Sequence, residues 1–140
     1  MAMALIACSK SEDDATKSDP NAQVEVTKAN LVGTWNINKI EGFTIPGDSL
    51  FQTMNFNNGD ATLTLTNDDK YTTTSTFGTS SGTYTVATVN GKKMLITIEP
   101  GDPADTLEVL SLTKSSMLGT DKQQEVNRGD DEYTKTYLSR

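Results

Sequence analysis

The side chains that could do chemistry in this chain are mainly carboxylates, because its 140 residues include no histidine and one cysteine. Without histidine there is no Ser-His or Cys-His nucleophilic site and few of the ligand sets that bind zinc. Two carboxylates at a set spacing are enough for glycoside hydrolysis. The acidic groups fall in predicted turns, where solvated carboxylates are expected: Asp68-Asp69, Asp102 and Asp105, and Asp130-Asp131-Glu132. We therefore predict a protein that is not an enzyme and that needs no cofactor or metal.

Two further motifs in predicted turns are explained by the turns themselves. Asn67-Asp68-Asp69 lacks the spaced oxygens and the terminal glutamate of an EF-hand calcium loop. Arg128-Gly129-Asp130 spells an adhesion tripeptide, but glycine and aspartate are ordinary turn residues. We interpret both motifs as turns.

The only cysteine, Cys8, lies between an apolar run and an acidic, serine-rich segment. Leu5-Ile6-Ala7-Cys8 resembles the bacterial lipobox, whose cysteine is lipidated after signal cleavage. The resemblance implies a bacterial outer-membrane lipoprotein, periplasmic or surface-exposed, that contacts the membrane through its lipid anchor only. Ser11-Glu12-Asp13-Asp14 is similar to an acidic tag that directs some lipoproteins to the cell surface. The alternative is an unmodified cysteine in a polar tail.

Charge and hydropathy exclude two other classes of protein. The net charge is −7, and the 12 Lys and Arg residues form no dense patch, so nucleic-acid binding is not expected. No run approaches the roughly 20 apolar residues that a membrane-spanning helix needs. The sequence indicates no particular protein partner.

The chain divides into three parts by composition. Residues 1–8 are interpreted as the remnant of a signal peptide that ends in the lipobox. Residues 9–28 are predicted to be a flexible tether, because they are polar and have almost no aliphatic content before Val24. Residues 29–140 are rich in threonine and β-branched side chains and alternate with a period of two, which predicts a single all-β domain.

Alternation and turn residues predict eight strands that follow one another along the chain. They cover LVGTWNINKI (31–40), ATLTLT (61–66), KYTTTSTF (70–77), TYTVATV (83–89), KMLITIE (93–99), TLEVLSLT (106–113), SMLGTDKQQEV (116–126) and DEYTKTYLS (131–139). One short helix is predicted after Asp48, as its N-cap, before Ser49, Leu50 and Phe51. Such strands are typical of an antiparallel up-and-down barrel or of a β-sandwich, and closure into a barrel is favoured because it removes exposed edges.

The first predicted strand contains Gly33-Thr34-Trp35, which resembles the G-x-W signature of the lipocalins. The succession SGTYTV, NGKKMLITIE, TLEVLSLTKSSM and EYTKTYLSR is similar to small lipocalin-like domains of bacterial lipoproteins. The resemblance implies an eight-stranded barrel over residues 29–140 in which the first strand pairs with the last. It also implies that Trp35 packs near one end under a basic side chain, either Arg140 or Lys135.

A barrel of this size is either filled by side chains or holds one small ligand. Alternation along each strand predicts an inward lining of apolar and aromatic residues. They are Leu63, Leu65, Tyr71, Phe77, Tyr84, Val86, Met94, Ile96, Leu107 and Val109. Such a lining suits a small apolar or amphipathic ligand, and binding one at the cell envelope is the predicted function. The alternative is a filled barrel, a non-catalytic accessory or adhesion module that binds protein or glycan through its loops.

Overall fold

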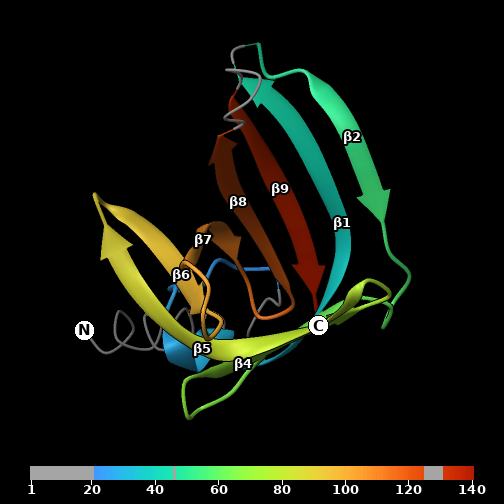
Figure 1. The fold of residues 1–140 in the computed structure, drawn as a ribbon. Helices are drawn as coiled ribbons and strands as arrows, with labels where there is room; N and C mark the ends of the chain where they lie inside the picture. Colours follow the sequence, from blue (N-terminus) through green and yellow to red (C-terminus); the bar gives the residue numbers. More distant parts are fainter. Residues whose placement is uncertain (1–20, 46, 125–130) are drawn as a thin grey trace, which may run out of the picture.

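The computed structural model describes residues 21–45, 47–124 and 131–140 (Figure 1). Within these ranges the chain forms one short helix and a sheet of nine strands in which all paired neighbours are antiparallel. The elements are α2 (Lys28–Leu31), β1 (Gly33–Ile45), β2 (Leu50–Asn55), β3 (Thr62–Leu65), β4 (Lys70–Ser75), β5 (Gly78–Val89), β6 (Lys92–Ile98), β7 (Asp105–Leu112), β8 (Ser116–Gln124) and β9 (Asp131–Ser139).

The sheet closes into a barrel because β1 pairs with β9 from Asn36 opposite Ser139 to Ile45 opposite Asp131. Along its other edge β1 has two partners, β3 beside its first residues and β2 beside its later ones. Since β2 and β3 both run antiparallel to β1 along one edge, they share one position in the barrel. The nine strands therefore form an eight-stranded barrel, which confirms the predicted fold class and the pairing of the first strand with the last.

Two hairpin turns contain residues that suit the positive φ angles found there. Asn90 and Gly91, between β5 and β6, have φ angles of 53° and 79°, as a two-residue Asn-Gly hairpin turn requires. Asp69, just before β4, also has a positive φ, of 65°. Aspartate and asparagine tolerate this conformation better than other residues with a side chain, which explains why these hairpins form where they do.

The short helix is not where the sequence predicted it. Asp48 is not an N-cap but has a φ of 50° in the turn before β2, and the segment after it is a strand. The helix is α2 instead, and the Thr27 hydroxyl caps it by accepting a hydrogen bond from the Asn30 amide at 3.3 Å. The prediction was wrong because β1 extends far beyond β3 and offers a free edge, whose backbone groups β2 satisfies.

The N-terminal segment from residue 21 to residue 28 belongs to the folded domain, although the predicted tether extends to residue 28. The Val24 amide donates to the Leu112 carbonyl at 2.8 Å, and Val24 and Val26 pack against the core. The Gln23 side chain accepts a hydrogen bond from the Leu112 amide at 3.2 Å. Alternation of Val24 and Val26 was too short a signal to show this packing. Residues 9–20 and Cys8 lie outside the described residues, and the tether there stays a prediction.

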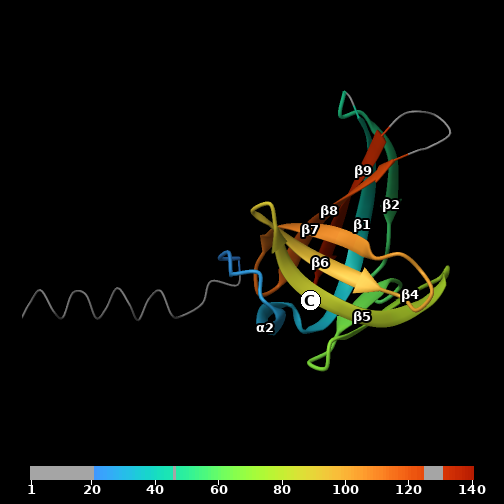
Figure 2. The same cartoon turned by 60° about the vertical axis from the view of Figure 1, so that its left-hand side comes forward.

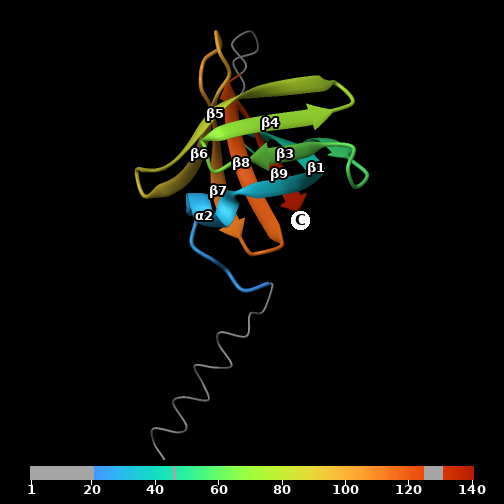
Figure 3. The same cartoon turned by 90° about the horizontal axis from the view of Figure 1, so that it is seen from below.

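The helix α2 lies at one end of the barrel, which we call the closed end (Figures 2 and 3). The hydrophobic core includes Leu31 of α2 and fills this end. The largest fully buried side chains are Trp35, Leu31, Leu65 and Leu112, and Leu31 comes from α2 itself. The indole of Trp35 donates a hydrogen bond to the Leu31 carbonyl at 2.9 Å. The helix thus acts as a plug whose backbone is tied to the core. None of the described helical residues form a helix long and apolar enough to cross a membrane.

Candidate functional site

A cavity of about 420 Å³ lies inside the barrel beyond this core. Four residues of the core line it and are themselves buried: Leu63, Tyr71, Leu95 and Leu138. Asp105 and Thr106 also line it but are exposed, and we call the side of the cavity that they form the mouth. The cavity therefore runs from the core to the surface, and its volume is in the range of small-molecule sites.

Three kinds of side chain line the cavity. They are apolar (Ile37, Ile40, Leu63, Leu95, Leu107 and Leu138), hydroxyl-bearing (Tyr71, Thr73, Thr97, Thr106, Thr134 and Thr136) and acidic (Asp105 and Asp121). No lysine or arginine belongs to the part of this lining that the structure describes. The site therefore offers apolar surface at its base and hydrogen-bonding groups and negative charge elsewhere.

The pleat of the strands explains why the threonines point into the cavity. Thr134, Thr136 and Leu138 follow one another at intervals of two along β9, so their side chains share one face of the sheet. In the neighbouring β1, Ile40 lies opposite Thr136 and Gly42 opposite Thr134. Threonine is a strong strand former, so it can supply hydroxyl groups to a cavity without weakening the strand that carries them.

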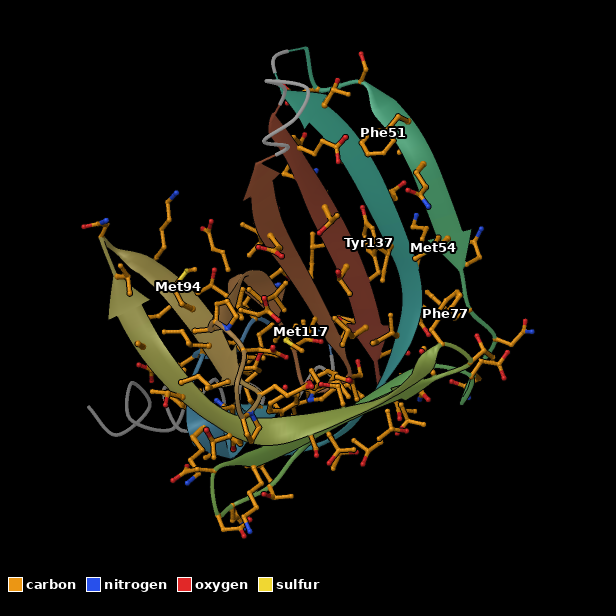
Figure 4. All side chains as sticks on the ribbon, viewed as in Figure 1. Phe51, Met54, Phe77, Met94, Met117 and Tyr137 are labelled. Carbon is orange, nitrogen blue, oxygen red and sulfur yellow. The ribbon has the colours of Figure 1, made fainter. Side chains whose placement is uncertain are left out.

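An aromatic ring of β2 lies beside β1 at Gly42. A side chain at Gly42 would place its Cβ 2.9 Å from the ring of Phe51, so Phe51 lies over the inner face of β1 at this glycine. The pairing of β1 with β2 shifts register between Gly42 and Phe43, which leaves Phe51 as the extra residue of a bulge. Figure 4 shows Phe51 and Met54 on β2. Phe51 is 49% exposed and is not one of the residues that line the cavity.

A short chain of hydrogen bonds joins the cavity to a third carboxylate. The Tyr71 hydroxyl lies 3.3 Å from the Ser80 hydroxyl, and Ser80 donates to the carboxylate of Glu99. This arrangement orients the Tyr71 hydroxyl within the lining. Among the described residues, no group of three or more carboxylates, histidines or cysteines could hold a metal ion. The arrangement can bind and orient a molecule.

Most of the side chains that alternation predicted to be inward lie in the barrel interior. Of these interior side chains, three line the cavity, and the other four belong to the core or pack against it. The cavity residues are Leu63, Tyr71 and Leu107, and the others are Leu65, Tyr84, Val86 and Val109.

Three predicted lining residues are elsewhere, and for them the prediction was wrong. Phe77 is 81% exposed in the turn between β4 and β5 (Figure 4). Met94 and Ile96 flank Leu95, which is the buried residue of β6, so they point to the outer face. The β6 segment is apolar at consecutive positions, and periodicity alone cannot choose between its two faces.

The sequence analysis missed the acidic part of the site. It predicted Asp105 to be a solvated turn residue, whereas Asp105 is the first residue of β7, pairs with Thr97 and lines the cavity. Its position two residues before Leu107 places both on one face of a strand, and this is the signal that could have revealed it. Asp121 was not predicted to be a site residue, because it lies in a polar stretch of β8 with little alternation of apolar and polar residues.

Gly33, Trp35 and Arg140 meet at the closed end. The guanidinium carbon of Arg140 lies 4.0 Å from the centroid of the Trp35 ring. A Cβ at Gly33 would lie 3.0 Å from Arg140 Nη1, so glycine leaves room for the guanidinium. Partial burial lowers the pKa of Arg140, which nevertheless stays charged. Lys135, the other candidate cation, instead lies 5.4 Å from the centroid of the Phe43 ring.

The barrel, its signature residues and its cavity agree with a comparison to known families. The family model described as a lipocalin-like domain matches residues 31–118, more than half of the chain. A search of curated proteins found no significant match. The matched segment includes Gly33 and Trp35 and ends within β8, and the structure adds β9, which closes the barrel. The chain therefore belongs to the family of lipocalin-like domains.

Proposed function

We propose that this protein binds a small apolar or amphipathic molecule in the cavity of its barrel and has no catalytic role. The observation that supports the proposal is the division of the interior into two parts. Trp35, Leu65 and Leu112 fill the closed end, so the fold is stabilised there. The remaining interior can then stay open as a cavity of about 420 Å³ without loss of the core.

Native mass spectrometry of the purified protein tests the proposal first, because a tightly held molecule would appear as an added mass. Titration with an apolar fluorescent probe tests it without knowledge of the ligand. Thr73 lines the cavity, so Thr73→Trp should fill part of it and weaken probe binding at least about tenfold. Thr72, its neighbour on β4, points to the opposite face, so Thr72→Trp is the matched control.

The outcome of this titration separates the two candidate functions. If the wild-type protein binds no probe, or Thr73→Trp and Thr72→Trp bind it equally, the cavity is not the binding site. A non-catalytic accessory or adhesion module that contacts protein or glycan through its loops would then be the better proposal. The exposure of Phe77 in the β4–β5 turn, 81%, favours that second candidate.

The proposal places the barrel at the bacterial cell envelope through a lipid on Cys8. Cys8 lies outside the described residues, so this part of the proposal is supported by the lipobox resemblance of Leu5-Ile6-Ala7-Cys8 alone. Each buried methylene of an acyl chain contributes about 0.8 kcal/mol to membrane binding. Full-length protein from a strain with lipoprotein processing should therefore partition into detergent, and Cys8→Ala should remain in the aqueous phase. Equal partitioning of both proteins would contradict the anchor.

A further inference from the structure

We infer that the cavity selects amphiphiles with a cationic head group, such as long-chain amines, over amphiphiles with an anionic head group. The inference rests on the proposed function, because it concerns the chemical class of ligand in the same cavity. It combines three observations: the position of the apolar base, the charge of the lining and the exposure of the mouth.

The position of the apolar base decides how an amphiphile would lie. Leu63, Leu95 and Leu138 line the cavity and are buried in the core, so an apolar chain gains most by pointing toward them. The polar end of the molecule then lies toward the mouth, where Asp105 and Thr106 are exposed. A head group in this position keeps contact with water and is within the part of the site that holds hydroxyl and carboxylate groups.

The charge of the lining decides which head group fits. Asp105 takes part in none of the ion pairs formed among the described residues. Lys92, which borders the neighbouring outer groove together with Asp121, is paired with Glu108 at 3.9 Å. Asp105 therefore keeps its negative charge at the mouth without a described ion-pair partner, and a ligand carboxylate there would meet like charge. An ammonium group would be attracted to Asp105.

The hydroxyl groups near the mouth complement an ammonium head group. Thr97 lies directly opposite Asp105 in the pairing of β6 with β7, and both line the cavity. The carboxylate of Glu99, two residues after Thr97, accepts a hydrogen bond from Ser80. An ammonium group has three donors and no acceptor, so it can use carboxylate and hydroxyl oxygens together.

Three probes with one chain length test the inference on the full-length protein: dodecylamine, dodecanol and dodecanoate, each below its micelle concentration. Their affinities are measured at pH 7 by displacement of an apolar fluorescent probe. We expect dodecylamine to bind at least about tenfold more tightly than dodecanoate, with dodecanol between them. Asp105→Asn should reduce the ratio of amine to carboxylate affinity severalfold, because it removes the exposed negative charge at the mouth of the cavity.

Asp102→Asn is the matched control, because it removes the same charge from an exposed position outside the cavity lining. If it reduces the ratio as much as Asp105→Asn, the preference reflects net charge and the inference is overturned. Equal binding of amine and carboxylate, with tight binding of dodecanol, would overturn the inference and leave the proposed function intact. Failure of all three probes to bind would overturn both.

Discussion

At the residue scale, the Trp35 side chain joins several distant parts of the chain at the closed end. It is fully buried, its indole donates to the Leu31 carbonyl at 2.9 Å, and Arg140 covers its ring. Trp35→Ala should lower the free energy of unfolding by about 3 to 5 kcal/mol, because it leaves a large cavity in the core. Trp35→Phe keeps an aromatic ring but leaves that carbonyl without its donor, so we expect a smaller loss of about 1 to 3 kcal/mol. Urea unfolding followed by circular dichroism measures both, and a loss below 1 kcal/mol for the alanine variant would contradict this role.

Arg140 has a role that its exposed position would not suggest. Besides covering Trp35, its guanidinium donates to the carbonyls of Asn30, Val32 and Lys114 at 2.9, 2.8 and 2.8 Å. We expect Arg140→Ala to lower the free energy of unfolding by about 1 to 2 kcal/mol, since exposed cation–π contacts and hydrogen bonds are each modest. Arg140→Lys should restore less than half of this, because an ammonium group lacks the planar fork that reaches several carbonyls. Full stability of the lysine variant in urea unfolding would show that charge alone is enough.

At the scale of the elements, β5 passes from one partner strand to the next at a glycine. Gly78 to Thr83 pair with β4 and Thr83 to Val89 pair with β6, so the two pairings meet next to Gly82. A Cβ at Gly82 would lie 2.0 Å from the Ile98 carbonyl oxygen, which belongs to the backbone and cannot move without β6. Gly82→Ala should therefore lower the free energy of unfolding by about 2 to 3 kcal/mol. Ser81→Ala, on the exposed neighbour, is the control and should change it by less than about 0.5 kcal/mol in the same thermal or urea unfolding measurement.

The segment before α2 is a second element whose contribution can be measured. Val24 and Val26 pack against the core, and the Thr27 hydroxyl caps the helix. A chain that starts at Lys28 loses all three contributions, and each kcal/mol lost lowers the melting temperature of a domain of this size by about 4 °C. We expect it to melt at least about 5 °C below a chain that starts at Asn21, by differential scanning calorimetry. Equal melting temperatures would show that residues 21–27 do not stabilise the domain and belong to the tether.

At the scale of the whole molecule, the barrel has a filled end and an open end, and stability should follow this division. The first residues of β1 pair with β3, whose Leu63 and Leu65 are buried, whereas its later residues pair with β2, which has no buried residue. Local opening is easier where a strand buries little apolar surface. In native-state hydrogen exchange, amides 34–37 should therefore be protected on the order of tenfold or more above amides 41–44. Equal protection along β1 would show that the barrel opens as one unit.

How much of this molecule can be predicted from sequence depends on whether a feature is local. Alternation in ATLTLT and the Asn90-Gly91 turn indicate strands and a hairpin wherever these segments end up, because side-chain period and turn dihedrals are set by neighbouring residues. The helix predicted after Asp48 was wrong for the opposite reason. A local capping signal could not reveal that β1 would leave an edge for residues 50–55 to cover.

The sequence by itself determined the all-β class and the signature around Trp35, because each of these depends on short segments. Only the tertiary structure decided which face of β6 turns inward, since its apolar residues are consecutive and packing alone distinguishes Leu95 from Met94. It also decided that the interior is filled at one end and hollow at the other. A cavity is the space left between strands far apart in the chain, so Asp105 and Thr134 become parts of one site only when the barrel closes.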